Sequence, residues 1–340
     1  MKNRKTNQEL FFSKTCDYLN HYLPNQVLKS NHTIETYRDA LTIFRRYVSD
    51  KKQISLKKFC FEDCTHDFLL DFIAFLKESG CAARTCNNRL AAIRAYLWYV
   101  ADGDISLQSI AINASKVPLL RVPESLRETI DEDAFAALLL APPNTKIGLR
   151  DRTIMILLYD SAIRVSELLE LKVQSLYTMT SIPYIRVHGK GDKERIVAIT
   201  DKTVAHLNAY MDKYHPDRVN DHPLFYTIIK GQVGVMSPGN VERILKKYAS
   251  QIRPEHPNLP EQIYPHMVRR TRATNLYQNG VELELVSRIL GHSSTETTKI
   301  YAIPSIDMMK EAMEKGNNST PEEAMWPDDE NELARLCGLR

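Results

Sequence analysis

Two histidines, an arginine and a tyrosine lie at short spacing near the C-terminal end of the chain. In the stretch 264–301, YPHMVRRTRATNLYQNGVELELVSRILGHSSTETTKIY, His266 precedes Arg269 by three residues and His292 precedes Tyr301 by nine. Imidazole and guanidinium groups that together carry positive charge suit a phosphate better than a carbonyl group or a lone metal ion. A tyrosine hydroxyl beside them is a nucleophile. These residue types therefore predict chemistry at a phosphate.

The pattern around His266 and Arg269 predicts a helix that places both side chains on one face. Pro265 suits the first turn of a helix, where a missing N–H costs nothing, and Asn279-Gly280 suits a left-handed cap at the end. Residues at i and i+3 are neighbours on a helix surface. The imidazole and the guanidinium are therefore expected to converge.

Two shorter helices are predicted between this helix and Tyr301. Apolar residues recur with helical period from Leu283 to Leu290, and Gly291 ends the run so that the next residue, a histidine, lies at a turn. Ser293-x-x-Glu296 has the form of a capping box and predicts a third helix that ends near Tyr301.

A second arginine lies beside a strongly apolar stretch. Residues 149–171, LRDRTIMILLYDSAIRVSELLEL, predict two helices separated at Ser161-Ala162, and the first is apolar nearly all round, as expected of a buried helix. Arg164 begins the second helix, and a helix N-terminus favours anions. Glu167 lies one turn further on and is able to orient the guanidinium.

The clearest β signal lies at 184–199, YIRVHGKGDKERIVAI. Two runs with β-branched residues flank Gly189-Lys190-Gly191-Asp192, which predicts a hairpin. On its own, a lysine in a glycine-flanked turn is usually exposed to solvent without a further role.

These motifs resemble those of the tyrosine site-specific recombinase (phage integrase) family, of the Xer or transposon-integrase type. H-x-x-R at 266–269, followed by L-G-H and a tyrosine nine residues on, has the family's order, and Ala-x-Arg-x-Ser-Glu-Leu at 162–168 matches its first arginine motif. The resemblance is strong from about Leu138 to Tyr301 and loose in the N-terminal part. Ala162 stands where many members have glycine, and Arg270 where many have a second histidine.

The resemblance implies a reaction and the residues that perform it. Tyr301 would attack a DNA phosphodiester to give a 3′-phosphotyrosyl link and a free 5′-hydroxyl. Lys190, rather than Lys193, would protonate the leaving oxygen, the arginines would hold the non-bridging oxygens, and the histidines would hydrogen-bond or assist proton transfer. Strands would be exchanged without ATP, a metal ion or any other cofactor. The implied catalytic residues, supported by Glu167, are Arg164, Lys190, His266, Arg269, His292 and Tyr301.

Composition sets the class of protein but decides little about its partner. The 340 residues, 43% hydrophobic and 26% charged, suffice for two domains with their own cores. The net charge of +3 is a weak argument for nucleic acid, although an acidic tail hides a more basic body. Without a run of about 18 apolar residues or a signal-peptide pattern, we expect a cytoplasmic, nucleoid-associated protein with no membrane contact. The six cysteines lack zinc spacing and predict reduced thiols and no metal site.

The pattern from Glu9 to about Ala111 predicts helix nearly throughout the N-terminal part. Helices are predicted from Thr33, from Asp67 to Lys77 and from Ala83 to Val100, and basic and amide side chains follow one face of the last of these. Such a face can be a solvated surface or can track DNA phosphates and base edges. The resemblance favours the second interpretation, because the family's small helical core-binding domain faces the major groove. The predicted DNA contacts, linker and catalytic domain included, are Thr33, Thr36, Arg38, Arg84, Thr85, Asn87, Asn88, Arg89, Arg94, Lys116, Arg121, Arg243 and Lys246.

The predicted fold is mainly α with a small antiparallel β-sheet, in the α+β class. An N-terminal helical core-binding (SAM-like) domain is expected at 1–112, a proline-containing linker at 113–127 and a catalytic tyrosine recombinase domain at 128–315. The acidic tail, 316–340, carries Trp326, Leu333, Leu336 and Leu339. It is expected either to fray or to dock on a neighbouring subunit, as the resemblance implies.

The predicted function is site-specific recombination of double-stranded DNA at inverted-repeat core sites. The simple two-domain form favours the integrase or transposase of a mobile element, acting as a homo-tetramer on two duplexes, a monomer or dimer when free, with accessory recombinases as further expected partners. Alternatives are an Xer-like chromosome-dimer resolvase, a type IB topoisomerase-like enzyme that religates the original strand, and a catalytically silent DNA-binding protein of the same fold.

Overall fold

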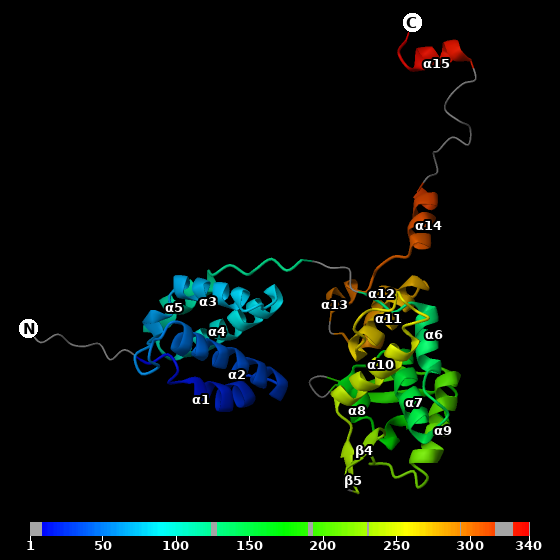
Figure 1. Cartoon of the computed structure of the whole chain (residues 1–340), viewed down its shortest axis with the longest axis horizontal. Helices are drawn as coiled ribbons and strands as arrows, with labels where there is room; N and C mark the ends of the chain where they lie inside the picture. The colour runs from blue at the N-terminus through cyan, green and yellow to red at the C-terminus, as the bar shows by residue number, and fades with distance from the viewer. Residues whose placement is uncertain are drawn as a thin grey trace, which may run out of the picture. The chain divides into compact units, whose positions relative to one another are not determined.

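The computed structural model describes residues 9–123, 128–189, 193–229, 231–292, 294–316 and 329–339. The chain divides into two compact units, Met1–Leu126 and Arg127–Arg340 (Figure 1). Helices dominate both units, and the strands form small antiparallel sheets. The predicted fold class is confirmed.

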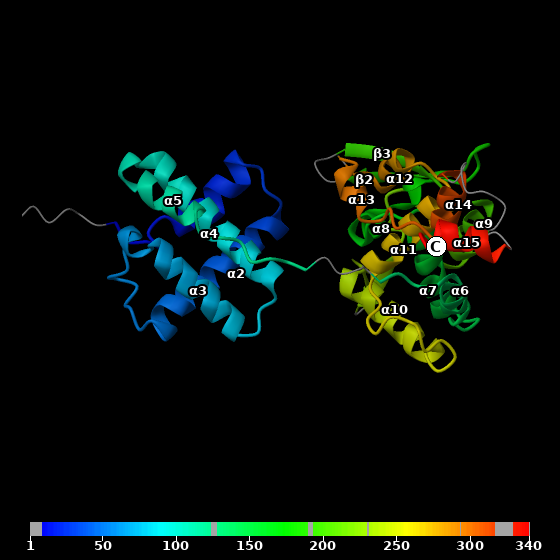
Figure 2. The ribbon, with the colours of Figure 1, turned by 90° about the horizontal axis from the view of Figure 1, so that it is seen from above.

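The first unit is built on α4, Ala83–Gly103, which packs against α2, α3 and α5 (Figure 2). Side-chain oxygens of Ser30 and Thr65 accept hydrogen bonds from backbone N–H groups and so start α2 and α3. Wide helical turns at Tyr18–Gln26 and Tyr47–Lys51 extend α1 and α2. The other α-helices described in this unit are α1 Thr15–Asp17, α2 Asn31–Arg46, α3 His66–Glu78 and α5 Gln108–Ser115, with short 3-10 helices at Phe61–Asp63 and Ile105–Leu107.

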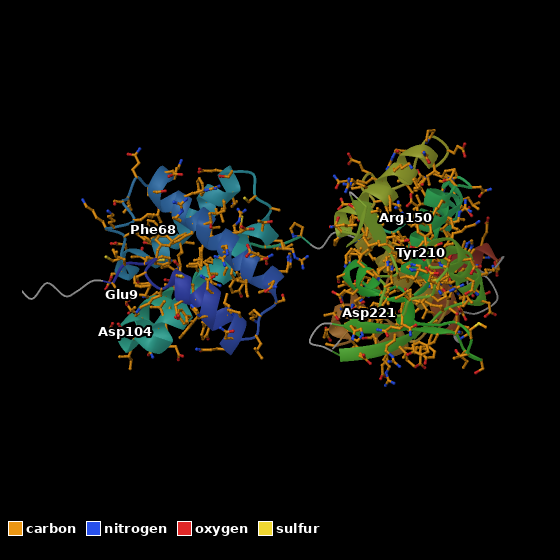
Figure 3. The ribbon with its side chains drawn as sticks, turned by 90° about the horizontal axis from the view of Figure 1, so that it is seen from below. Glu9, Phe68, Asp104, Arg150, Tyr210 and Asp221 are labelled. Carbon is orange, nitrogen blue, oxygen red and sulfur yellow. The ribbon has the colours of Figure 1, made fainter. Side chains whose placement is uncertain are left out.

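Aromatic rings fill the core of this unit. Phe44 is fully buried, and the ring of Phe68, labelled in Figure 3, meets it edge-on with centroids 6.0 Å apart. The buried Tyr96 hydroxyl of α4 donates to the carbonyl oxygen of Phe11 at 2.6 Å, which satisfies its polar end inside the core. The core thus fixes α4, the helix that carries six of the thirteen predicted DNA contacts.

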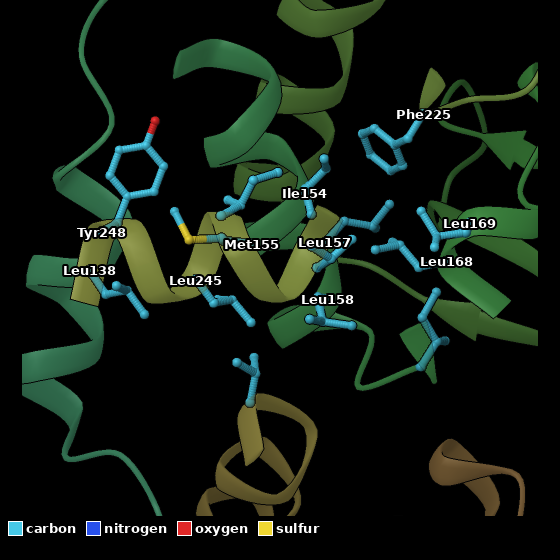
Figure 4. Close-up of a cluster of buried hydrophobic side chains, with 14 of the residues drawn as sticks. Leu138, Ile154, Met155, Leu157, Leu158, Leu168, Leu169, Phe225, Leu245 and Tyr248 are labelled. Atoms are coloured by element: carbon cyan, nitrogen blue, oxygen red, sulfur yellow. The ribbon is translucent and has the colours of Figure 1, made fainter. Parts of the chain in front are cut away.

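The second unit is built around α7, Lys146–Asp160. Ile154, Met155 and Leu157 are fully buried and lie near Leu245 and Tyr248 of α10 (Figure 4). The prediction of a buried helix followed by a break at Ser161-Ala162 is confirmed. The α-helices described in this unit are α6 Glu132–Leu140, α7, α8 Val165–Glu170, α9 Asp201–Tyr214, α10 Pro238–Ile252, α11 Pro265–Gln278, α12 Leu283–Leu290, α13 Glu296–Lys299, α14 Ile306–Gly316 and α15 Glu330–Leu336, with a short 3-10 helix at Val173–Ser175.

Two antiparallel sheets complete the second unit. The first has the order β1 (Leu176–Tyr177), β2 (Tyr184–Gly189) and β3 (Lys193–Ala198), with Gly189 paired to Lys193. It confirms the predicted hairpin strands, whereas the turn 190–192 lies outside the described residues. The second sheet, β4 (Tyr226–Ile229) and β5 (Gln232–Val235), has no counterpart in the predictions.

One carboxylate fastens the end of α7 to two other helices. Asp160 accepts from the Thr200 N–H at 2.8 Å and the Thr203 hydroxyl at 2.7 Å, where α9 begins, and pairs with Arg272 of α11 at 3.4 Å. The chain leaves this anchored point directly toward Arg164. The start of α8 is therefore held in place relative to α11.

Two further expectations concern the environment of the chain. No helix in the described ranges is long and apolar enough to cross a membrane. The six cysteines are all free thiols.

Candidate active site

Arg269 lies at the centre of the site and is 1% exposed. Its NH1 donates to the Ala162 carbonyl oxygen at 2.6 Å, and its NH2 donates to the Leu290 carbonyl oxygen at 2.7 Å and to His292 Nε2 at 3.1 Å. A single guanidinium from α11 therefore joins the α7–α8 connection, the end of α12 and the turn that follows α12. These are three of the segments that carry the sequence-predicted residues.

Ala162 has the left-handed backbone conformation that favours glycine. Its φ is +49°, an uncommon value for a residue with a Cβ atom. The conformation turns the Ala162 carbonyl toward Arg269 and leads the chain into Arg164. This is a physical reason for the glycine that many members of the resembled family have at the same position, and it shows that alanine is accommodated here.

The tautomer of His292 follows from its two neighbours. A guanidinium only donates, so Nε2, 3.1 Å from Arg269 NH2, must accept. The proton therefore resides on Nδ1, which donates to the Thr298 hydroxyl at 2.8 Å. Burial and the positive charges of Arg269 and Arg164 lower the pKa of His292 to about 4. The imidazole is neutral at physiological pH.

The local chain geometry places His292 for these contacts. Gly291 ends α12 with φ +62°, as the sequence predicts. The turn brings the His292 imidazole within hydrogen-bonding distance of Arg269. The predicted capping box at Ser293 lies outside the described residues, but the third helix begins at Glu296 rather than directly after Ser293. The Glu296 N–H bonds instead to the Ser294 hydroxyl at 3.2 Å.

Tyr301 is buried beside this cluster. It is 2% exposed and packs in a small group with Ala162, Ala273, Val286 and Leu290. Its ring stacks toward His292 with centroids 6.0 Å apart and an interplanar angle of 25°. The tyrosine of this chain therefore lies in the neighbourhood of this chain's own arginines.

Arg164 and Glu167 form the predicted pair. Glu167 Oε1 accepts from Arg164 NH1 at 2.8 Å, and Oε2 accepts from the Arg164 backbone N–H at 2.8 Å. Burial raises the pKa of Glu167, but hydrogen bonds from Arg195 and from Arg164 outweigh it and lower the pKa to about 2. The side chain of Arg164 remains 37% exposed, so part of its guanidinium faces solvent.

Arg195 is a member of the site that the sequence reasoning missed. It comes from β3, and its NH1 and NH2 donate to both oxygens of Glu167 at 3.0 and 2.8 Å. Its only sequence signal was a basic residue in the run GKGDKER, where attention fell on the lysines. The pairing depends on the packing of the β2–β3 hairpin against α8 through β2, which local pattern does not reveal.

The charges of the cluster do not balance. Three guanidiniums, from Arg164, Arg195 and Arg269, surround one carboxylate, that of Glu167, which leaves an excess of two positive charges. Burial and the neighbouring Arg164 lower the pKa of Arg269 to about 10, the sign expected for a crowded cation. An anion placed among them would relieve this repulsion. The arrangement is therefore suited to a phosphate.

The remaining predicted catalytic residues differ in how far the structure places them. His266 is exposed on the first turn of α11, and its charge contributes to the lowered pKa of His292. Lys190 lies outside the described residues, so its predicted role stays a prediction. Five of the six catalytic candidates therefore come from segments that the fold brings together.

Arg270, where many family members have histidine, has an architectural position. It is 5% exposed, and it donates to the Glu128 carbonyl oxygen at 2.9 Å and to the Tyr264 hydroxyl at 2.7 Å. The neighbouring Thr271 hydroxyl accepts from the Ile130 N–H at 3.0 Å. The chain just before α6 is thus bound to the helix that carries Arg269.

The predicted DNA contacts divide by their exposure. The Asn87 amide exchanges two hydrogen bonds of 2.9 Å with the backbone of Leu120, and Arg94 donates to the carbonyl oxygens of Ala114 and Val117. Both side chains bind α4 to the end of α5 and to the segment after it, so these hydrogen-bonding groups have partners within the protein. The contacts that are exposed are Thr36, Arg84, Thr85, Asn88, Lys116, Arg121, Arg243 and Lys246.

Several of the other predicted contacts also have partners within the chain. Arg38 donates to Asn20 at 3.0 Å, Arg89 to the Cys81 thiol at 3.0 Å and Lys246 pairs with Glu242 at 2.6 Å. Thr33 is half-buried, and its N–H completes the cap at Ser30. Arg243 is hydrogen-bonded to Asn240.

We expect the Nδ1–H tautomer of His292 to depend on Thr298, which is fully buried. Thr298→Val removes the acceptor of Nδ1–H, so the tautomer equilibrium should shift toward Nε2–H, which opposes Arg269. Nitrogen-15 chemical shifts of the imidazole report this directly. Thr297→Val, which removes an exposed hydroxyl, is the matched control. An unchanged tautomer in Thr298→Val would contradict the assignment.

The low pKa of His292 also predicts a pH dependence of stability. Between pH 6.5 and about 4 the unfolded chain binds a proton at this imidazole and the folded chain does not. Folding stability should therefore fall as the pH falls through this window, measured by urea unfolding. In His292→Gln this contribution is absent, and an identical pH slope in both proteins would contradict the assignment.

Comparison with known proteins agrees with this geometry. The family model described as "Phage integrase family" matches residues 128–306, and the model "Phage integrase, N-terminal SAM-like domain" matches residues 17–102. The chain is 30% identical over 312 residues to the tyrosine recombinase XerC of Chlamydia muridarum, covering 85% of this chain and 93% of the relative. It is 28% identical over 289 residues to XerD of Staphylococcus epidermidis, covering 84% and 92%.

Solved structures share the fold at lower identity. The Tn1549 transposon integrase in complex with a circular intermediate DNA aligns with a TM-score of 0.68 at 16% identity, covering 91% of this chain and 99% of that one. The XerH recombinase bound to its difH substrate aligns with a TM-score of 0.62 at 21% identity, covering 82% and 78%. The family model spans more than half of the chain, and its match coincides with the segments that converge on Arg269. The chain belongs to the phage integrase family of tyrosine recombinases, enzymes that cleave and rejoin DNA strands in site-specific recombination.

Proposed function

We propose that this enzyme recombines double-stranded DNA at inverted-repeat core sites through a 3′-phosphotyrosyl intermediate formed by Tyr301, as the integrase or transposase of a mobile element. The observation that carries the chemistry is the convergence of Tyr301, His292 and Arg164 around the buried Arg269. The excess of two positive charges in this cluster suits the scissile phosphate. No cofactor enters the proposed reaction.

Each residue has a role in the proposed reaction. The Tyr301 oxygen forms a bond to phosphorus while the bond from phosphorus to the 5′-oxygen breaks. Arg164 and Arg269 hold the non-bridging oxygens, whose negative charge grows in the transition state. Lys190 donates the proton that converts the leaving 5′-oxygen to a hydroxyl. Its assignment rests on family resemblance.

The histidines have different parts in this proposal. The Nε2 lone pair of His292 already accepts from Arg269, and a pKa of about 4 makes this imidazole a weak base. We therefore assign hydrogen bonding to His292 and the phenol's proton to His266. Because Tyr301 is 2% exposed, DNA binding must rearrange the α13 segment before the phenol meets a phosphate.

A nicked DNA substrate tests the nucleophile. When the protein cleaves it, a short fragment diffuses away and leaves a covalent complex that is visible on a denaturing gel. We expect wild-type protein to form this complex and Tyr301→Phe to form none while binding the same DNA, because phenylalanine fills the same buried space without the hydroxyl. A covalent complex in Tyr301→Phe would disprove the assignment, and Tyr277→Phe serves as a control.

We propose that α4 presents Arg84, Thr85 and Asn88 to DNA, with Thr36 of α2 contributing to the same interface. All four side chains are exposed, and arginine with small polar residues is suited to phosphates and base edges. Asn87 is excluded because its amide is committed to Leu120. A basic contact of this kind weakens as salt rises.

Adjacent asparagines on α4 separate DNA contact from folding. Asn88→Ala should weaken DNA binding with unchanged stability, because its side chain is exposed. Asn87→Ala should lower the free energy of unfolding by about 1–3 kcal/mol, because it removes both hydrogen bonds to Leu120. Urea unfolding and a DNA-binding titration measure the two effects. The reverse pattern would show that the interface is assigned to the wrong face.

We further propose that α14 docks on a second copy of the chain within a tetramer on two duplexes. Ile306, Met309 and Met313 are 81%, 46% and 73% exposed and recur at helical spacing, so α14 carries an apolar stripe exposed in the single chain. The proposal extends to the acidic tail that follows, 316–340. Crosslinking of DNA-bound protein, with and without Met313→Glu, tests the assembly.

An Xer-like chromosome-dimer resolvase is the second candidate. It is favoured by the XerC and XerD relatives, which match over most of both chains. The two candidates differ in their DNA sites and share the site chemistry. Recombination assays on plasmids that carry either the sequences flanking the gene or the host replication terminus distinguish them. We propose action on DNA in the cytoplasm for both.

A further inference from the structure

We propose that Arg195 is a positioning residue of the active site: it holds the Glu167 carboxylate so that the Arg164 guanidinium stays directed toward the substrate phosphate. This inference rests on the proposed DNA cleavage, because it assigns a function to a residue behind Arg164. Arg195 itself need not touch DNA. It acts through the carboxylate that both arginines share.

The Glu167 carboxylate is saturated with donors. Oε1 accepts from Arg164 NH1 at 2.8 Å and from Arg195 NH1 at 3.0 Å. Oε2 accepts from the Arg164 backbone N–H and from Arg195 NH2, both at 2.8 Å. A carboxylate has about four lone-pair sites, so each is used. The two N–H groups of Arg195 occupy two of these sites, in the planar, two-pronged geometry that fixes the orientation of the carboxylate.

Burial makes this arrangement sensitive to the loss of a partner. The side chain of Glu167 is 4% exposed and that of Arg195 is 17% exposed, whereas that of Arg164 is 37% exposed. Without Arg195, a buried carboxylate would keep one guanidinium only. Because an incompletely paired buried carboxylate is unfavourable, Glu167 would bind further N–H groups of Arg164 and move its guanidinium inward. Arg164 would then withdraw from the exposed side, where a phosphate can enter.

Arg195 also packs against the turn that carries His292. A Cβ atom built on Gly291 would lie 2.7 Å from the Cζ and Nε atoms of Arg195 and 2.9 Å from its NH1. A side chain at Gly291 would therefore displace the guanidinium. Glycine is required here for its φ of +62° and also for the space that Arg195 occupies.

Arg195 thus lies on one segment of the site and contacts two others. It lies on β3, it binds the first turn of α8 and its guanidinium covers the glycine at the end of α12. Small displacements of a catalytic group can lower a rate about 10²-fold. A residue at this junction has the position needed to cause such displacements without contacting the reacting atoms.

Single-turnover cleavage of a nicked DNA substrate by Arg195→Gln tests the proposal. We expect covalent-complex formation at saturating DNA to slow about 10²-fold, with DNA affinity within about twofold of wild type, because the lost alignment affects the transition state. Arg195→Lys keeps the charge and loses the planar fork, so it should recover part of the rate. Arg253→Gln, which removes an arginine that binds the carbonyls of Leu259, Pro260 and Glu261, is the matched control for general destabilisation.

Two further measurements separate positioning from a general structural role. In an Arg164→Ala background, Arg195→Gln should slow cleavage little further, because Arg195 acts through Arg164. On a substrate whose scissile phosphate is a neutral methylphosphonate, the gap between wild type and Arg195→Gln should shrink, because less guanidinium charge is needed. If Arg195→Gln does not fold, Arg195→Lys is subjected to both comparisons.

The outcomes distinguish this inference from the proposed function. If wild-type protein forms no covalent complex, the proposed function fails. If wild type cleaves and Arg195→Gln or the folded Arg195→Lys cleaves equally fast, the inference is wrong. It is also wrong if the defects of Arg164→Ala and Arg195→Gln multiply, or if Arg195→Gln loses DNA affinity in proportion to its rate.

Discussion

The hydrogen bonds of the buried Arg269 guanidinium hold the active site together. Its NH1 and NH2 donate to the carbonyl oxygens of Ala162 and Leu290 and to the imidazole of His292, so one side chain holds three segments of the chain together. Burying a cation is costly unless its donors are satisfied. The fold meets part of that requirement: backbone carbonyls bind NH1 and NH2 and keep the net charge positive, while the buried Nε has no hydrogen-bond partner among the described residues. A carboxylate in the same place would neutralise the site before a phosphate arrived.

Electrostatic imbalance links the stability of the protein to its substrate. The pKa of Glu167, about 2, keeps this carboxylate ionised, so it compensates one positive charge. The three guanidiniums of Arg164, Arg195 and Arg269 together carry two positive charges more than that. Burial and this excess of positive charge together lower the pKa values of Arg269 and His292. Without a bound anion, the positive charges of the site repel one another, which is electrostatically unfavourable. In the proposed reaction the DNA phosphate would supply the missing negative charge, as expected of a preorganised phosphoryl-transfer site.

The helical unit shows how one helix divides its faces between folding and a surface. On α4, Tyr96 is buried in the aromatic core, and Arg94 and Asn87 bind the segment after α5. Arg84 and Asn88 remain exposed. Identical residue types therefore have different roles a few positions apart. The periodicity of a helix predicts which residues share a face, but it does not reveal which loop will cover that face.

The sequence alone determined the family motifs, the helical class and the hairpin strands, because these depend on local spacing and on caps such as Gly291. Tertiary structure decided which groups meet. Arg195 became part of the site only through packing of the β2–β3 hairpin against α8, and Thr298 became a partner of His292 only through the turn after α12. Hydrogen bonds between residues distant in the chain have no local pattern. Their partners are chosen by burial, where each polar group must find an acceptor or donor within the fold.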